Sequence, residues 1–121
     1  MFNFLKKLKL NEEENRTYHN DFRIAGVTFK NDDGSDRQII IQSLKDNDLV
    51  QLKVYSFKEK EAIGVYTMDN KQIGNIKDGE IPYVLDIMKT MTKSIIFDIH
   101  PFYNDNHEKI YTAKVIIYYT K

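Results

Sequence analysis

Histidines and carboxylates near the C-terminus are the first residues whose types and spacing could support chemistry. His100 and His107 flank a turn-forming segment, and Asp98 and Asp105 lie close to them in the sequence. Imidazole and carboxylate groups that meet across a hairpin can bind zinc. Histidines at neighbouring loop positions are, however, usually just solvated polar residues. We therefore predict neither a metal site nor a cofactor.

A pair of acidic residues, Glu59 and Glu61, would share one face of an extended strand, as an acid–base pair requires. They alternate with Lys58 and Lys60, which indicates a charged loop. The five glycines are dispersed and form no phosphate-binding loop. The absence of cysteine excludes disulfides and thiolate chemistry. We expect that the protein is not an enzyme.

Aromatic residues next to cations make a better case for binding. Phe and Tyr make up 12% of the chain, which has no Trp. Phe22 precedes Arg23, and Phe57 precedes Lys58. The bases of a single strand stack on such rings while nearby cations hold the phosphates. The alternative is that these rings only build a small β core.

The composition limits the class of protein. A chain of 121 residues suits one domain, and its eighteen Lys and Arg residues balance its eighteen Asp and Glu residues. A neutral chain lacks the broad positive surface that duplex DNA requires, although a local site remains compatible. The longest apolar runs are too short to span a bilayer, and no secretory signal is present. We expect a cytoplasmic protein without a membrane span.

Residues 1–20 differ from the rest and form an N-terminal amphipathic segment and linker. Phe2, Leu5 and Leu8 are three residues apart, which predicts a short helix. Residues 1–10 could therefore dock on a protein partner or a membrane surface, or fold back on the domain.

Residues 21–121 have the pattern of a small β domain. Clusters of Asn, Asp and Gly separate β-patterned segments, among them 22–30, 39–41, 50–55, 63–67, 95–103 and 111–119. Apolar residues from Val84 to Met91 recur with helical spacing, which predicts a helix over residues 82–93 that starts at Pro82. We predict a mainly β fold, an OB-like or SH3-like β-barrel of about six strands with one main helix.

The order of several short motifs resembles that of HIRAN domains over about residues 21–120. The motifs are Phe22-Arg23-Ile24-Ala25-Gly26-Val27, Ala62-Ile63-Gly64-Val65, Gln72-Ile73-Gly74, the helix, and Pro101-Phe102. HIRAN domains are fused to SWI/SNF-type helicases that remodel stalled replication forks, and also occur as stand-alone bacterial proteins. The resemblance implies a stand-alone bacterial or phage-type member with an OB-like barrel. It also implies a pocket for the free 3′ end of single-stranded DNA.

The resemblance further implies which residues form that pocket. The family's basic and aromatic residues before the first Gly correspond to Phe22-Arg23-Ile24. A family loop, Asn-Pro-Tyr-Asp, presents its Asp to the terminal hydroxyl, and Ser56-Phe57-Lys58-Glu59 stands in its place. Phe102 matches a Phe that stacks on the terminal base. The predicted binding residues are Arg23, Ile24, Tyr55, Phe57, Lys58, Glu59 and Phe102.

Three functions follow from these observations. The first is a nucleic-acid-binding module for single-stranded DNA ends, or RNA. It requires Arg23, Phe102 and residues 56–59 to converge on one open cavity. The alternative is a protein-interaction module that keeps the barrel without the DNA pocket, for which we expect a flat apolar patch. A metal-dependent hydrolase would require His100, His107 and carboxylates to share an ion.

Overall fold

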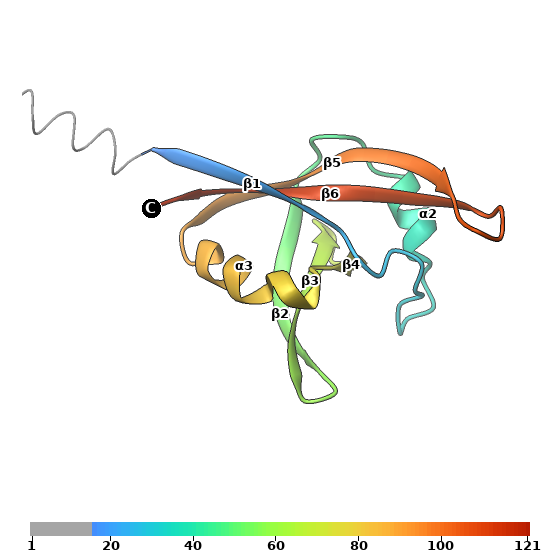
Figure 1. Ribbon diagram of the computed structural model, residues 1–121, viewed down its shortest axis with the longest axis horizontal. Coiled ribbons are helices and arrows are strands. Elements are labelled where there is room, and N and C mark those ends of the chain that lie inside the picture. The colour runs from blue at the N-terminus through green and yellow to red at the C-terminus, as the bar shows by residue number, and fades with distance from the viewer. Residues whose placement is uncertain (1–15) are drawn as a thin grey trace, which may run out of the picture.

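The computed structural model describes residues 16–121, and within them six strands form two antiparallel sheets (Figure 1). The hydrogen-bonded strand orders are β1-β6-β5 and β2-β3-β4. The predicted mainly β fold is therefore confirmed, whereas one closed six-stranded barrel is not seen. Isolated bridges between Leu49 and Ile95 and between Ala25 and Asn75 connect the two sheets. The predicted N-terminal helix lies outside the described residues.

The first sheet contains β1 (Thr17–Arg23), β5 (Met91–Tyr103) and β6 (Lys109–Thr120). From Ala113 to Tyr119 in β6, the side chains of Ala113, Val115, Ile117 and Tyr119 are buried while those between them are half-buried. This alternation arises because successive side chains of a strand point to opposite faces. Thr17 pairs with Thr120, so β1 begins inside the segment assigned to the linker.

The second sheet contains β2 (Val50–Phe57), β3 (Lys60–Thr67) and β4 (Gln72–Asn75). Lys58 and Glu59 connect β2 to β3 with φ angles of 50° and 65°. Two successive residues with positive φ form the tight turn that suits the twist of a hairpin. Gly74 lets β4 approach the chain that follows β1, since a Cβ there would lie 2.5 Å from the carbonyl oxygen of Ala25.

Two helices occur in the described part of the chain besides a short 3₁₀ turn, η1 (Asp78–Glu80). The first, α2 (Arg37–Gln42), includes the apolar run 39–41, which sequence analysis had placed among the β-patterned segments. An Asp36 carboxylate oxygen accepts a hydrogen bond from the Gln38 backbone N–H at 2.9 Å and so caps the helix. The cap favours a helical start over an extended one, and Ile40 and Ile41 still enter the core.

The main helix, α3 (Ile81–Met88), is shorter than the predicted 82–93. β5 begins at Met91, which pairs with Tyr119, and the Thr120 backbone N–H donates to the Thr90 carbonyl oxygen at 3.1 Å. These sheet hydrogen bonds compete with further helical ones, and β-branched Thr90 and Thr92 fit a strand better than a helix. Of the apolar residues from Val84 to Met91 that predicted the helix, Met91 therefore belongs to strand β5 instead.

The core lies between the two sheets and the two helices. Its largest fully buried side chains are Ile24, Ile41, Ile63, Ile73, Ile96 and Ile117, with Val65, Val84 and Val115. The helices α2 and α3 lie toward opposite ends of β6 (Figure 1). None of the helices in residues 16–121 is long and apolar enough to cross a membrane.

Candidate ligand-binding pocket

A pocket of about 480 Å³ opens between α2, the turn after β1, and the β2-β3-β4 sheet. We call it the Arg37 pocket. Its lining residues are Phe29, Lys30, Asp32, Arg37, Tyr55, Phe57, Ala62, Asn75, Ile76 and Asp78. The pocket therefore combines aromatic rings, charges of both signs and an amide, which are the groups that recognise a polar aromatic ligand.

Arg37 is the buried charge of this pocket, with only 7% of its surface exposed. Its Nε donates to the Asn31 Oδ1 at 2.8 Å, and its Nη1 donates to the Gly26 carbonyl oxygen at 2.9 Å. The other terminal nitrogen, Nη2, makes no hydrogen bond to a residue in the 16–121 range. Burial lowers the pKa of the Arg37 guanidinium, but an arginine side chain remains protonated in proteins. The pocket thus holds a fixed cation whose two Nη2 N–H groups have no hydrogen-bond acceptor among residues 16–121.

The local sequence around Gly26 and Asn31 builds the support for Arg37. Gly26 has φ +67°, a conformation that glycine adopts without steric cost, and its carbonyl oxygen thereby accepts from Arg37. The Asn31 Nδ2 donates to the Gln72 carbonyl oxygen at 2.9 Å, which ties this turn to β4. The cap at Asp36 then places Arg37 in the first turn of α2. The acceptors of Arg37 in this turn are therefore close to it in sequence, and the turn itself is held in place by its hydrogen bond to β4.

Asn75 connects the guanidinium to the hydroxyl of Tyr55. Its Oδ1 accepts from Arg37 Nη1 at 3.2 Å, and its Nδ2 donates to the Tyr55 hydroxyl oxygen. Gln72 Nε2 is also 3.5 Å from that oxygen. Because the hydroxyl oxygen accepts in these contacts, and its own O–H donates to no residue in the described part of the chain, that O–H can donate to a ligand.

Two phenylalanine rings flank the pocket and remain exposed. Phe29 is 64% exposed and Phe57 is 58% exposed, although burying such a ring is favourable by roughly 1.5–3 kcal/mol. The Arg37 Cζ lies 5.9 Å from the centre of the Phe29 ring, and the Lys58 Nζ lies 5.4 Å from that of Phe57. Exposed rings beside cations are stacking surfaces for a planar ligand.

The structure brings only some of the predicted site residues to this pocket. Tyr55 and Phe57 line it. Ile24 is 2% exposed and belongs to the core, so its side chain is not available to a ligand. Lys58 and Glu59 form the β2-β3 turn and do not line the pocket.

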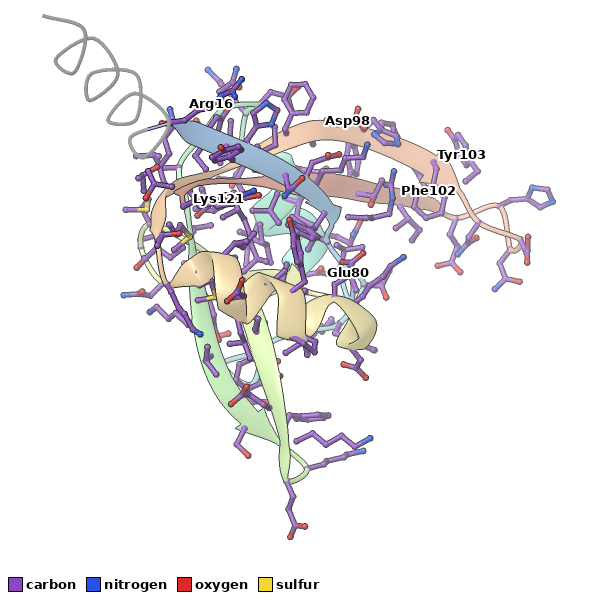
Figure 2. All side chains as sticks on the ribbon, turned by 60° about the vertical axis from the view of Figure 1, so that its left-hand side comes forward. Arg16, Glu80, Asp98, Phe102, Tyr103 and Lys121 are labelled. Carbon is purple, nitrogen blue, oxygen red and sulfur yellow. The ribbon has the colours of Figure 1, made fainter. Side chains whose placement is uncertain are left out.

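Arg23 and Phe102 lie on the other sheet. Arg23 Nη1 donates to the Thr112 Oγ1 at 3.3 Å, and Phe102 pairs with Ile110 across the β5-β6 hairpin. Figure 2 shows Phe102 on that hairpin, away from the tip of the β2-β3 hairpin. Arg23 and Phe102 therefore do not converge with Phe57 on the Arg37 pocket, and these two predicted binding residues lie on a different surface.

Eight of the ten lining residues were not predicted from the sequence, and the sequence held a signal for two of them, Phe29 and Lys30. Phe29-Lys30 begins three residues after Gly26 and is an aromatic–basic pair like Phe57-Lys58. Arg37 and Asn75 stand out less, because their role depends on a hydrogen-bond network between α2 and β4 that no spacing reveals.

The histidine and carboxylate cluster considered for metal binding is only a pair. His100 Nδ1 lies 3.4 Å from the Asp98 Oδ1. Across residues 16–121 no three histidine, aspartate or glutamate side chains lie close enough to bind a metal ion. His100 and His107 therefore do not come together with carboxylates as a metal-binding cluster in this part of the chain.

The chain matches no family model, no curated protein and no solved structure. The case for a function consequently depends on the pocket geometry and on the motifs described above.

Proposed function

We propose that this protein is a nucleic-acid-binding module that takes the free 3′ end of single-stranded DNA in the Arg37 pocket. The observation that carries the proposal is a buried guanidinium with free N–H groups in a pocket flanked by two exposed phenylalanine rings. A phosphate accepts from Arg37, and Lys30 adds a second cation. A base stacks on Phe57 or Phe29, which contributes about 1–3 kcal/mol.

The carboxylates of the pocket favour a terminal hydroxyl over a terminal phosphate. Asp32 and Asp78 line the same cavity as Arg37 and accept hydrogen bonds from a sugar hydroxyl. A second phosphate beside them would meet like charges at short range, which is unfavourable. Because Glu59 lies outside the pocket, these aspartates take the role that the HIRAN resemblance implied for it. That resemblance supports the same ligand.

Fluorescence anisotropy with a short labelled single strand tests this proposal. We expect a strand with a 3′ hydroxyl to bind more tightly than one with a 3′ phosphate. Phe57→Ala should weaken binding roughly tenfold or more, because the stacking surface is lost. Phe102→Ala is the matched control, since it removes an exposed ring from the other sheet, and it should leave the Kd nearly unchanged.

Two results would contradict the proposal. If Phe102→Ala weakens binding and Phe57→Ala does not, the strand binds on the β1-β6-β5 sheet instead of the pocket. If no strand binds even at low salt, the nucleic-acid function is wrong, and a protein-interaction module becomes the better hypothesis.

A further inference from the structure

An apolar groove lies apart from the Arg37 pocket and shares no lining residue with it. Two hollows of about 630 and 350 Å³ meet at Leu49 and Met68. The apolar residues that line them are Ile39, Ile40, Leu44, Leu49, Val50, Leu52, Met68 and Met91. We call this surface the Leu49 groove. Ile39, Leu49 and Met68 are 67%, 51% and 57% exposed, an unusual concentration of bare aliphatic surface.

The larger hollow carries more negative than positive charge. Asp48 and Asp69 line it, against one cation, Lys71. A hydrogen bond from the Thr67 hydroxyl lowers the pKa of Asp69, so this carboxyl stays ionised at neutral pH. In the smaller hollow, Lys93 directs its Nζ over the Tyr118 ring, 4.8 Å from the centre. An occupant that is apolar and positively charged therefore fits the groove.

Residues 1–10 of this chain have that composition. Their sequence, Met-Phe-Asn-Phe-Leu-Lys-Lys-Leu-Lys-Leu, includes three lysines and no acidic residue. It also supplies five large apolar side chains after the initiating methionine, from Phe2 to Leu10. In a neutral chain, this decamer is the most basic apolar segment and is complementary to the groove.

The strand register shows that this segment can reach the groove within one molecule. Thr17 pairs with Thr120 on β6, and Met91 pairs with Tyr119 from the other side of β6. Neighbouring strands are about 4.8 Å apart, so the start of β1 lies only about 10 Å across the sheet from Met91. Residues 11–16 can span up to about 20 Å when extended. The connection is therefore long enough.

A second hollow lies close to the start of β1 but suits this segment less well. Tyr83, Ile87 and Tyr119 line it, together with Lys89 and Lys121. Its two lysines outnumber its single carboxylate, Asp86, so a lysine-rich segment meets like charges there.

We propose that residues 1–10 bind in the Leu49 groove of the same molecule. Phe2, Leu5 and Leu8 fill the apolar hollows, and the intervening lysines face Asp48 and Asp69. This binding is independent of the function proposed for the Arg37 pocket and shields aliphatic surface that water would otherwise cover.

Methionine methyl NMR on the full chain tests the proposal. The chain contains four methionines, of which Met68 and Met91 line the groove and Met88 lies on α3. Leu5→Asp/Leu8→Asp should shift the carbon-13 methyl signals of Met68 and Met91 and leave Met88 in place. Losing two buried leucines lowers the docking equilibrium constant at least about tenfold. Asn11→Asp/Asn15→Asp adds the same charge outside the decamer and should shift neither signal.

The remaining outcomes overturn the proposal. Unchanged Met68 and Met91 signals would show that the decamer does not occupy the groove. A shift of Met88 alone would place the decamer against α3. If the Met68 and Met91 signals depend on protein concentration and the mass by light scattering doubles, the occupant comes from a second copy of the chain.

Discussion

Arginine suits position 37 because the N–H donors of its guanidinium group lie in one plane and form a rigid fork. Three acceptors from different segments meet that fork, namely the Asn31 side chain, the Gly26 backbone and the Asn75 side chain. A lysine places one charge at the end of a flexible stem and cannot satisfy all three at once. The residue thus links the turn after β1 to β4 and also lines the pocket.

Arg37→Lys should therefore reduce both stability and ligand binding. We expect the free energy of unfolding to fall by about 1–3 kcal/mol, because buried acceptors lose their donors. Denaturant unfolding measures the first effect, and anisotropy with the 3′-hydroxyl strand measures the second. Arg23→Lys is the matched control, since the exposed Arg23 makes one 3.3 Å hydrogen bond, and it should change neither value appreciably.

Asp69 is a second residue whose properties depend on a single contact, because a hydrogen bond from Thr67 is the main cause of its lowered pKa. The Thr67 hydroxyl donates to the Asp69 carboxylate, and this bond holds the pKa of Asp69 below its ordinary 3.8. A carboxyl with a lowered pKa stabilises the fold above its unfolded-state pKa. That stabilisation disappears as the pH falls through the lower, folded-state pKa.

Thr67→Val should raise the pKa of Asp69 toward its ordinary value. An NMR titration that follows the Asp69 carboxyl carbon measures the change. Thr67→Ser keeps the hydroxyl and should keep the lowered pKa. An unchanged pKa in Thr67→Val would show that this hydrogen bond does not cause the shift.

Among the elements, β4 depends on the absence of a side chain at Gly74. A Cβ there would lie 2.3 Å from the Ile24 Cγ2 and 2.5 Å from the Ala25 carbonyl oxygen. The approach permits the paired backbone hydrogen bonds between Ala25 and Asn75, both 2.8 Å long. Since Asn75 holds Arg37 and Tyr55, the same approach positions the pocket.

Gly74→Ala should destabilise the protein by about 1–3 kcal/mol, because neighbouring backbone must move to accept the methyl group. Gly79→Ala is the control, since nothing lies within 4 Å of a Cβ at that position in η1. Thermal unfolding of both variants compares them directly. Equal melting temperatures would show that β4 can shift away from Ala25 without cost.

The elements also show which part of the fold can be predicted from sequence. The pattern of apolar residues between turn signals correctly indicated β2, β3 and the β5-β6 hairpin, because each of these strands contributes buried side chains to the core. It failed for α2, where three consecutive isoleucines carry no period and the Asp36 cap decides the conformation. Only a small part of the Arg37 pocket was predictable. Phe57 adjoins Lys58 and Tyr55 lies two residues from Lys53, whereas Arg37 meets Asn75 only through tertiary contacts.

For the whole molecule, a net charge of zero limits how strongly salt can affect binding. Only Arg37 and Lys30 supply cations to the pocket lining, so few phosphates are neutralised. Each neutralised phosphate of a single strand contributes a slope of about −0.7 in a plot of log K against log salt. We expect a slope between about −0.7 and −1.5, measured by anisotropy over a range of potassium chloride concentrations. A much steeper slope would indicate an extended cationic surface beyond the pocket.

The pairing of Thr17 with Thr120 places the two ends of the unit formed by residues 17–120 at one corner of the β1-β6-β5 sheet. Such a unit can be spliced into a surface loop of a host protein by two short joints, because its ends are a strand's width apart. Because the start of β1 and the end of β6 lie side by side, a circular permutant can join them and place its new chain ends elsewhere. The mostly exposed turn of residues 104–108, between β5 and β6, is a suitable place for the new ends. In either arrangement the Arg37 pocket, which is lined by α2 and the β2-β3-β4 sheet, would lie away from the joint and stay open to solvent.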